Sequence, residues 1–274
     1  MKFRRMQKIL GLSLVLLTAC SPQEKPGHES AGHEPAVPLA ESGAEKHWSY
    51  EGETSPEHWT ELEEGAACNG NAQSPINLLT MRVKEGSSGL ERQSFHHAEA
   101  TTIDNIVNNG HSIQYNFTNE ENYMEWRGHR FVLTQFHFHA PSEHTIDGVR
   151  YPLVMHMVHR SEKKEFAVVA LLFKEGAFSN SFEFLESYLP IHPGETKEIN
   201  QPYNFANDIP HQFDHYHYQG SLTTPPCTEG VNWFVFKEPA TLSVEQLNAL
   251  ASLMPHNNYR KEQPLNGRKI ILGP

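Results

Sequence analysis

The sequence predicts a mainly β (α+β) domain that is built on a mostly antiparallel sheet and has few, short helices. Three observations favour this fold class. Apolar or alternating runs of strand length recur along the chain, Gly, Pro or charged residues bound them, and helical patterns are few and short. Strands that are joined by turns rather than by regular helices favour antiparallel pairing.

The expected strands occupy the middle and the end of the chain. In order they cover residues 101–109, 111–117, 130–140, 151–160, 165–174 and 231–237. The first two are separated by a single glycine, which favours a tight turn between them. The others are apolar or alternating runs that Gly, Pro or charged residues bound.

Helices are expected at three places. Residues 243–253 begin with Ser243 and Gln246 in capping-box spacing, and apolar residues follow at helical intervals. Residues 181–189 and 56–64 are shorter candidates.

The N-terminal part of the chain is expected to lie outside the fold. Residues 1–19 combine a basic start with a short apolar run, as in a secretory signal peptide. The stretch "LTAC" resembles a bacterial lipobox, which implies cleavage before Cys20 and a lipid on its sulfur; an ordinary signal peptide with a chance cysteine is the alternative. Residues 20–45 are rich in Pro, Glu, Gly, Ser and Ala, so we expect a disordered tether.

These features predict an exported protein that is lipid-anchored to a bacterial membrane, on its periplasmic or cell-surface side. The folded domain is expected over residues 46–274, with no second linker and no internal repeat. Apart from the lipid, no membrane contact is expected. The sequence leaves the oligomeric state open.

Composition narrows the function. The formal net charge of −11 argues against nucleic acid as a partner, because such binding needs a basic surface. The chain has 18 histidines, which favours at least one metal site over a purely surface role for these residues. Beyond Cys20, Cys68 and Cys227 are most simply one disulfide in an exported protein, although the sequence does not show that they approach each other.

The stretch "FHFHAPSEH" carries the strongest local signal. On a strand, His137 and His139 share one face with Gln135, which could accept an outward ring N–H, while the intervening phenylalanines pack on the other face. His156, on a later strand, could complete three ligands if the two strands are neighbours. Three histidines with an open fourth position are typical of a catalytic zinc site. At this point His159 and the pair His215 and His217 remain alternative ligands.

Several motifs in order resemble the α-class carbonic anhydrases, in their bacterial branch. They are "NNGHS", "QFHFHAPSEH", "MHMVH" and "GSLTTPPCTEGVNW", and the likeness runs from "HWSYEG" to "NNYRKEQPLNGR", over nearly all of residues 46–274. The resemblance implies a large, twisted, mostly antiparallel central sheet with small peripheral helices. It also implies Zn²⁺ on His137, His139 and His156, and reversible hydration of carbon dioxide to bicarbonate and a proton. In that chemistry hydroxide on the zinc attacks the substrate, and a histidine shuttles the proton.

The resemblance also assigns roles around the metal. Thr223 would accept the hydrogen bond of the hydroxide and give its own proton to Glu143. His111 would be the proton shuttle, with Tyr50 and Asn109 organising the waters of the proton path. Positions that would line the substrate pocket are Val158, Val168, Leu222, Thr224 and Trp233, and Cys68 and Cys227 match the disulfide pair of the bacterial branch.

One position departs from the family pattern. Two residues before His156 the family places a glutamate that accepts the second ring N–H of this ligand, and here the residue is Val154. Loss of such a partner typically weakens metal affinity or activity about 10- to 100-fold. We therefore expect weaker or faster-exchanging zinc. Val154 and the histidines of the tether also support the rival reading, a non-catalytic zinc-binding or adhesive surface lipoprotein that keeps the fold.

Overall fold

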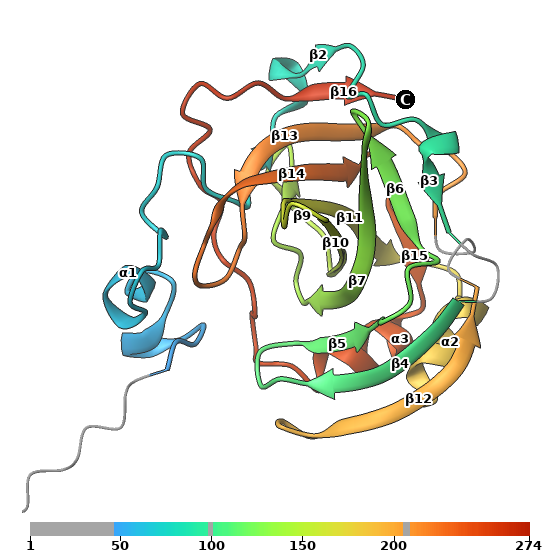
Figure 1. Cartoon of the computed structure of the whole chain (residues 1–274). Helices are drawn as coiled ribbons and strands as arrows, with labels where there is room; N and C mark the ends of the chain where they lie inside the picture. The colour runs from blue at the N-terminus through green and yellow to red at the C-terminus, as the bar shows by residue number, and fades with distance from the viewer. Residues whose placement is uncertain (1–46, 98–100, 205–208) are drawn as a thin grey trace, which may run out of the picture. The chain divides into compact units, whose positions relative to one another are not determined.

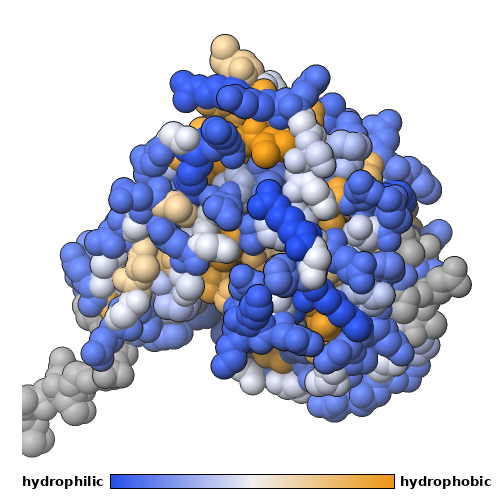
Figure 2. Space-filling model, turned by 45° about the horizontal axis from the view of Figure 1, so that its top comes forward, coloured by the Kyte–Doolittle hydropathy of each residue, from blue (hydrophilic) through white to orange (hydrophobic). Residues whose placement is uncertain are grey.

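The computed structural model describes residues 47–97, 101–204 and 209–274. The predicted signal peptide, Cys20 and the tether lie outside these residues. Within the described part of the chain, no helix is long and apolar enough to cross a membrane. Figure 2 shows that hydrophilic residues cover most of one face of the molecule, with hydrophobic residues in small groups between them.

One large sheet organises the chain (Figure 1). Its main path runs β12 (Thr196–Tyr203), β4 (Thr101–Asn108), β5 (Ile113–Asn116), β7 (His129–His139), β10 (Leu153–Ser161), β11 (Phe166–Glu175), β14 (Glu229–Phe236), β13 (His215–Ser221), β16 (Ile271–Gly273) and β2 (Lys84–Glu85). Off this path, β15 (Ala240–Leu242) pairs with β11, and β6 (Tyr123–Trp126) pairs with β7 and β3 (Phe95–His96). In Figure 1 the strand direction turns strongly from β13 through β7 to β12, as expected for a twisted sheet.

Short elements complete the described residues. A small sheet contains β1 (Asn77–Leu78), β8 (Thr145–Ile146) and β9 (Val149–Arg150). The helices are α1 (Trp59–Leu62), α2 (Asn180–Glu186) and α3 (Val244–Ala251), with single 3₁₀ turns at Gly52–Thr54, Thr80–Arg82 and Arg92–Ser94. The capping box predicted at Ser243 and Gln246 is present at the start of α3.

The predicted fold class is confirmed, with three corrections of detail. Strand β11 pairs in parallel with β14 and β15, because the long connection after β11 lets the chain cross over before it returns to the sheet. Two of the longer strands, β12 and β13, were not predicted, because their polar residues hide the strand pattern, and neither were the strands of two to four residues outside the predicted ranges. The helices are shorter than expected; α1 ends where Glu63 leaves the helical conformation, at φ −114° and ψ 114°.

Alternation along the strands divides the core into two clusters. On β10, Met155 and Met157 face a cluster that also holds buried residues of α2 and α3, so the helices cover this face. Val154 and Val158 face the other cluster, together with Val168. Because side chains alternate along a strand, His156 belongs to the second face. This is the face that carries the site.

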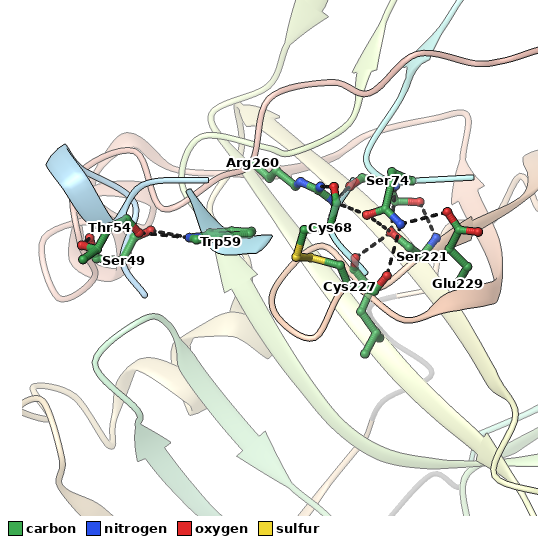
Figure 3. Close-up of a disulfide and its surroundings, with 11 residues drawn as sticks. Ser49, Thr54, Trp59, Cys68, Ser74, Ser221, Cys227, Glu229 and Arg260 are labelled. Atoms are coloured by element: carbon green, nitrogen blue, oxygen red, sulfur yellow. Dashed lines mark hydrogen bonds between the residues drawn. A yellow bond between two sulfur atoms is a disulfide. The ribbon is translucent and has the colours of Figure 1, made fainter. Parts of the chain in front are cut away.

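A disulfide joins the N-terminal segment to the loop after β13. The bond joins Cys68 and Cys227, which are 159 residues apart in sequence, and both are buried (Figure 3). The guanidinium of Arg260 donates to the carbonyl oxygen of Cys68 at 2.6 Å. A cross-link of this kind typically contributes about 2–4 kcal/mol to stability. The disulfide predicted from the cysteine count is confirmed.

Candidate metal centre

The pairing of β7 with β10 brings three histidines together. His156 lies directly opposite His137 in the antiparallel register, and His139 follows two residues along the same face of β7. The candidate ligand atoms of His137, His139 and His156 all lie within 4.8 Å of one another. From the sequence, His156 could complete the site only if its strand lay beside that of His137 and His139. The structure shows that the two strands are neighbours.

Two of the three rings have a hydrogen-bond partner for the nitrogen that points away from the cluster. Nδ1 of His137 lies 2.9 Å from Oε1 of Gln135, as the shared strand face suggested. Nδ1 of His139 lies 2.6 Å from the backbone oxygen of Asn258. These contacts leave Nε2 of both rings for a metal, because a neutral imidazole with a donating Nδ1–H has its lone pair on Nε2.

The third ring is turned the other way. Nδ1 of His156 lies 3.8 Å from Oε2 of Glu143, and Nε2 of His139 lies 3.6 Å from the same oxygen. Nε2 of His156 is buried and has no hydrogen-bond partner among the described residues. Val154, on the same strand face, is fully buried in the apolar cluster and offers no acceptor.

Electrostatics favour neutral rings. Burial lowers the pKa of His137 well below its usual value, and the neighbouring His139 lowers it further. The pKa of His156 is also well below its usual value, first through burial and then through His139, His137 and His144. Neutral rings keep the lone pairs that a metal requires, so the three nitrogens form a donor set that fits Zn²⁺.

The alternative histidines lie on the opposite face of the sheet and have other contacts. Nδ1 of His159 is 3.1 Å from the carbonyl oxygen of Met157 on its own strand. Nε2 of His215 is 2.6 Å from the Ser88 hydroxyl, and Nδ1 of His217 is 3.0 Å from the Trp233 carbonyl oxygen. Strand alternation therefore separates these three from the cluster.

Glu143 is a fully buried acid beside the cluster. Its Oε1 accepts a hydrogen bond of 2.9 Å from the backbone N–H of Arg260, while its Oε2 has no partner among the described residues. Thr223 is buried as well, with an exposed fraction of 5%. The loop that carries Thr223 is closed by backbone hydrogen bonds, 2.9 Å from Leu222 N to Thr228 O and 2.8 Å from Cys227 N to Thr224 O.

An apolar wall adjoins the histidines. Val158 on β10 pairs with Val168 on β11, which pairs with Trp233 on β14, so the three side chains form one row across the face of the sheet. Leu222 packs against the same cluster, and Thr224 is half-buried. The next row on the same face of the sheet contains His137 and His156, which are paired two residues along β10 from Val158. This arrangement places the predicted pocket residues next to the candidate ligands.

His111 stands at the edge of the sheet in a group of aromatic rings. Its ring stacks on Trp48 with a centroid separation of 3.7 Å and an interplanar angle of 13°. Its Nε2 lies 3.2 Å from Nε2 of His47, which is exposed and reaches Glu63 through its other nitrogen at 3.3 Å. Burial lowers the pKa of His111, and the charge of His47 lowers it further.

The two other residues of the expected proton path have distinct surroundings. Oδ1 of Asn109 accepts the backbone N–H groups of His111 and Ser112, at 2.9 and 2.8 Å, so this side chain shapes the turn that carries His111. The hydroxyl of Tyr50 is buried and has no partner among the described residues. The pKa of Tyr50 is well above its usual value because of burial and, to a smaller extent, the negative charge of Glu143.

Sequence reasoning missed the contribution of residues 258–260. Asn258 accepts from His139 through its backbone oxygen, and its side-chain Oδ1 accepts the N–H of Ala140 at 2.8 Å. Arg260 holds Glu143 through its backbone and binds the N-terminal segment through its guanidinium. The only signal for these residues was the stretch "NNYRKEQPLNGR", which carried the family likeness without a role for any residue.

Comparisons with known proteins agree with the site. Residues 54–273 match the family model for eukaryotic-type carbonic anhydrases. A carbonic anhydrase of Klebsiella pneumoniae is 42% identical over 228 residues, which cover 82% of this chain and 90% of that protein. One of Neisseria gonorrhoeae is 35% identical over 262 residues, 95% of this chain and 96% of that protein.

A solved structure supports the same relationship. The α-carbonic anhydrase from Thermovibrio ammonificans, in complex with the inhibitor sulfanilamide, aligns with a TM-score of 0.76 at 39% identity. The alignment covers 82% of this chain and 98% of that one. The fold of this chain therefore agrees with that of this relative over most of both chains.

Proposed function

The chain belongs to the eukaryotic-type carbonic anhydrase family and catalyses the zinc-dependent, reversible hydration of carbon dioxide, and on this premise we propose how its residues divide the work. His137, His139 and His156 hold the ion. The observation that carries this assignment is the convergence of three imidazoles whose candidate ligand atoms all lie within 4.8 Å of one another. A bound Zn²⁺ supplies hydroxide at neutral pH, since it lowers the pKa of its water from about 15.7 to about 7.

Glu143 and Thr223 orient the reacting groups. The unpartnered Oε2 of Glu143 is the acceptor for the Thr223 hydroxyl proton, which leaves the threonine oxygen as an acceptor on the substrate side. Arg260 fixes the carboxylate through its other oxygen. Thr224 lines the position of the substrate and of bicarbonate, and the row of Val158, Val168 and Trp233, together with Leu222, forms the apolar pocket for carbon dioxide.

His111 moves the proton out. In the hydration direction its neutral ring accepts a proton from the site, and the lowered pKa keeps the ring neutral at pH 7. His47, in contact with His111 and exposed, connects the ring to bulk solvent. Tyr50 and Asn109 organise the path, the first from the buried side and the second through the turn that carries His111.

Stopped-flow hydration of carbon dioxide by the zinc-loaded full chain tests the function. Fast hydration is expected, with loss on chelation and recovery when zinc is added back. A folded protein with one zinc per chain and no hydration above buffer would instead support the non-catalytic binding protein, which the unpartnered Nε2 of His156 beside Val154 favours.

Glu143→Gln tests the orienting role separately. The amide keeps an oxygen for the backbone N–H of Arg260 but replaces the acceptor for the threonine proton with a donor. We expect a loss of about 100- to 1,000-fold in kcat with zinc content unchanged. A kcat within about twofold of the parent would contradict the assignment.

The N-terminal features lead to a second proposal, on location. Residues 1–19 direct export, Cys20 carries a lipid, and residues 20–45 tether the domain of residues 46–274 to a bacterial membrane, on its periplasmic or cell-surface side. Cys20→Ser should move the protein from the membrane fraction to the soluble fraction and remove the lipid mass from the N-terminal peptide. An unlipidated mature N-terminus in the parent protein would overturn this proposal.

A further inference from the structure

Two buried ring nitrogens beside the metal cluster have no hydrogen-bond partner among the described residues. They are Nε2 of His156 and Nδ1 of His144, in side chains with exposed fractions of 1% and 0%. The two ring centroids are 6.0 Å apart, and both rings pack against Trp233, at 4.9 and 4.7 Å. Leaving a buried polar group without a hydrogen bond is unfavourable, so two unpartnered nitrogens this close are expected to pair with each other.

One combination of tautomers makes these two nitrogens complementary. A metal on Nδ1 of His156 requires the ring proton on Nε2, which then points away from the cluster as a donor. Nε2 of His144 lies 2.6 Å from the Tyr218 hydroxyl, which lies 2.9 Å from the Ser74 hydroxyl. If the protons run from His144 to Tyr218 to Ser74, the lone pair of His144 is on Nδ1, the nitrogen without a partner.

Other buried acceptors are less suitable. Oδ1 of Asn232 also has no partner, but Asn232 precedes Trp233 on β14, and strand alternation puts it on the opposite face of the sheet. Val154 replaces the family's carboxylate with an apolar side chain. His144 is thus the unpartnered acceptor that shares the packing of His156 against Trp233.

We propose that His144 is a positioning residue for His156 and accepts its Nε2–H in place of the missing carboxylate. A small turn of either ring, or one internal water with both nitrogens as partners, spans the gap. The neutral imidazole keeps the ligand ring oriented, but it polarises the ring less than a carboxylate would. This inference rests on zinc binding at the three histidines, and it explains how the site tolerates Val154.

The test is a double-mutant cycle on zinc dissociation, measured by transfer from the zinc-loaded full chain to a colorimetric chelator. His144→Phe removes the acceptor, His144→Gln keeps one, and Val154→Glu supplies the carboxylate. His144→Phe is expected to speed zinc loss about 10-fold or more, His144→Gln to restore most of the parent rate, and Val154→Glu to reduce the effect of His144→Phe to less than about twofold.

The outcomes separate this inference from the assignment of the zinc site. A parent protein that holds no zinc overturns the site itself. Zinc bound at one ion per chain, with parent-like dissociation from His144→Phe, overturns only the role of His144. An equal effect of His144→Phe with and without Val154→Glu also overturns it, because His144 would then act independently of the acceptor.

Nitrogen NMR gives an answer that does not depend on any variant folding. In the zinc-loaded parent with ¹⁵N-labelled histidine, the proposal expects a protonated Nε2 in His156 and an unprotonated, hydrogen-bonded Nδ1 in His144. A proton on Nδ1 of His144 would overturn the proposal.

Discussion

On β7, the ring nitrogens of His137 and His139 that point away from the cluster each have a partner, whereas on β10 the corresponding nitrogen of His156 has none. The two strands are hydrogen-bonded neighbours; β10 is buried at this point, whereas Gln135 and His137 on β7 are half-buried. The difference lies in what stands behind each ring. The side-chain amide of Gln135 stands behind His137, a backbone oxygen stands behind His139, and the apolar cluster with Val154 stands behind His156.

This contrast teaches that two properties of the site arise separately: the position of the ligand nitrogens, and the hydrogen-bond partner that supports each ring from behind. The register of β7 and β10 brings the three metal-facing nitrogens together whatever stands behind the rings. Support is a local property of each ring, and it can be lost at one ring without moving the others. Partners behind metal ligands are typically worth about 10- to 100-fold in affinity or activity. The β10 side is therefore the place where this zinc site is expected to be weak.

The largest expected effect comes from removing the β10 ligand altogether. His156→Ala should lose zinc and reduce hydration to the uncatalysed rate, because two remaining histidines do not make a catalytic zinc site. Metal analysis after gel filtration, together with stopped-flow assays, measures both. His159→Ala is the matched control on the same strand, since its ring faces the other side and bonds to Met157. Zinc loss from the control rather than from His156→Ala would refute the ligand set.

A smaller effect is expected from giving His156 on β10 a hydrogen-bond partner, as the ligands on β7 already have. Val154→Glu supplies an acceptor for Nε2 of His156, so zinc dissociation should slow by about 10- to 100-fold. Val154→Leu, similarly apolar, is the control and should leave the rate unchanged. Both variants need a check of thermal unfolding, because position 154 is fully buried. An unchanged dissociation rate in a folded Val154→Glu protein would show that the absent carboxylate does not limit zinc binding.

The reverse change should leave a ligand ring on β7 without a hydrogen-bond partner, as His156 is on β10. Gln135→Leu removes the partner of Nδ1 in His137, and zinc should dissociate about 10-fold faster. The effect is placed at the lower end of the usual range because both residues are only half-buried, so water can replace the amide. Gln135→Glu keeps an acceptor and should not accelerate zinc loss. Acceleration by both variants would point to a packing role for Gln135 instead.

The smallest expected effect lies away from both strands, at His111. Hydration should fall as the pH drops through the pKa of His111, since only its neutral ring accepts a proton. His47→Asn removes the second cause of the lowered pKa, so that pKa rises and the fall in rate moves to higher pH. The pH profile of kcat at low buffer concentration, with His58→Asn as the control, checks this. A profile that stays in place would show that His47 does not act on the shuttle.

The strands could be predicted where both faces are apolar. Residues 151–160 and 165–174 read as strands because Val, Leu, Met and Phe fill them, and β10 and β11 occupy nearly these ranges. Strand β13 was not predicted because "HYHYQGS" looks polar. Its histidines are buried nevertheless, since Ser88 and the Trp233 carbonyl oxygen satisfy their ring nitrogens from distant parts of the chain. A local pattern does not contain such partners.

The sequence by itself determined the fold class, the family and the candidate ligands, because alternation on a strand is a local property and the motifs stand in the chain as written. It also located the departure at Val154. The family resemblance named the three ligands, and the tertiary structure gave the physical reason, because the exclusion of the rival histidines depends on which strands pair and which face each ring takes. The tertiary structure also supplied Asn258, Arg260 and His144, since hydrogen bonds between residues far apart in sequence exist only once the chain is folded.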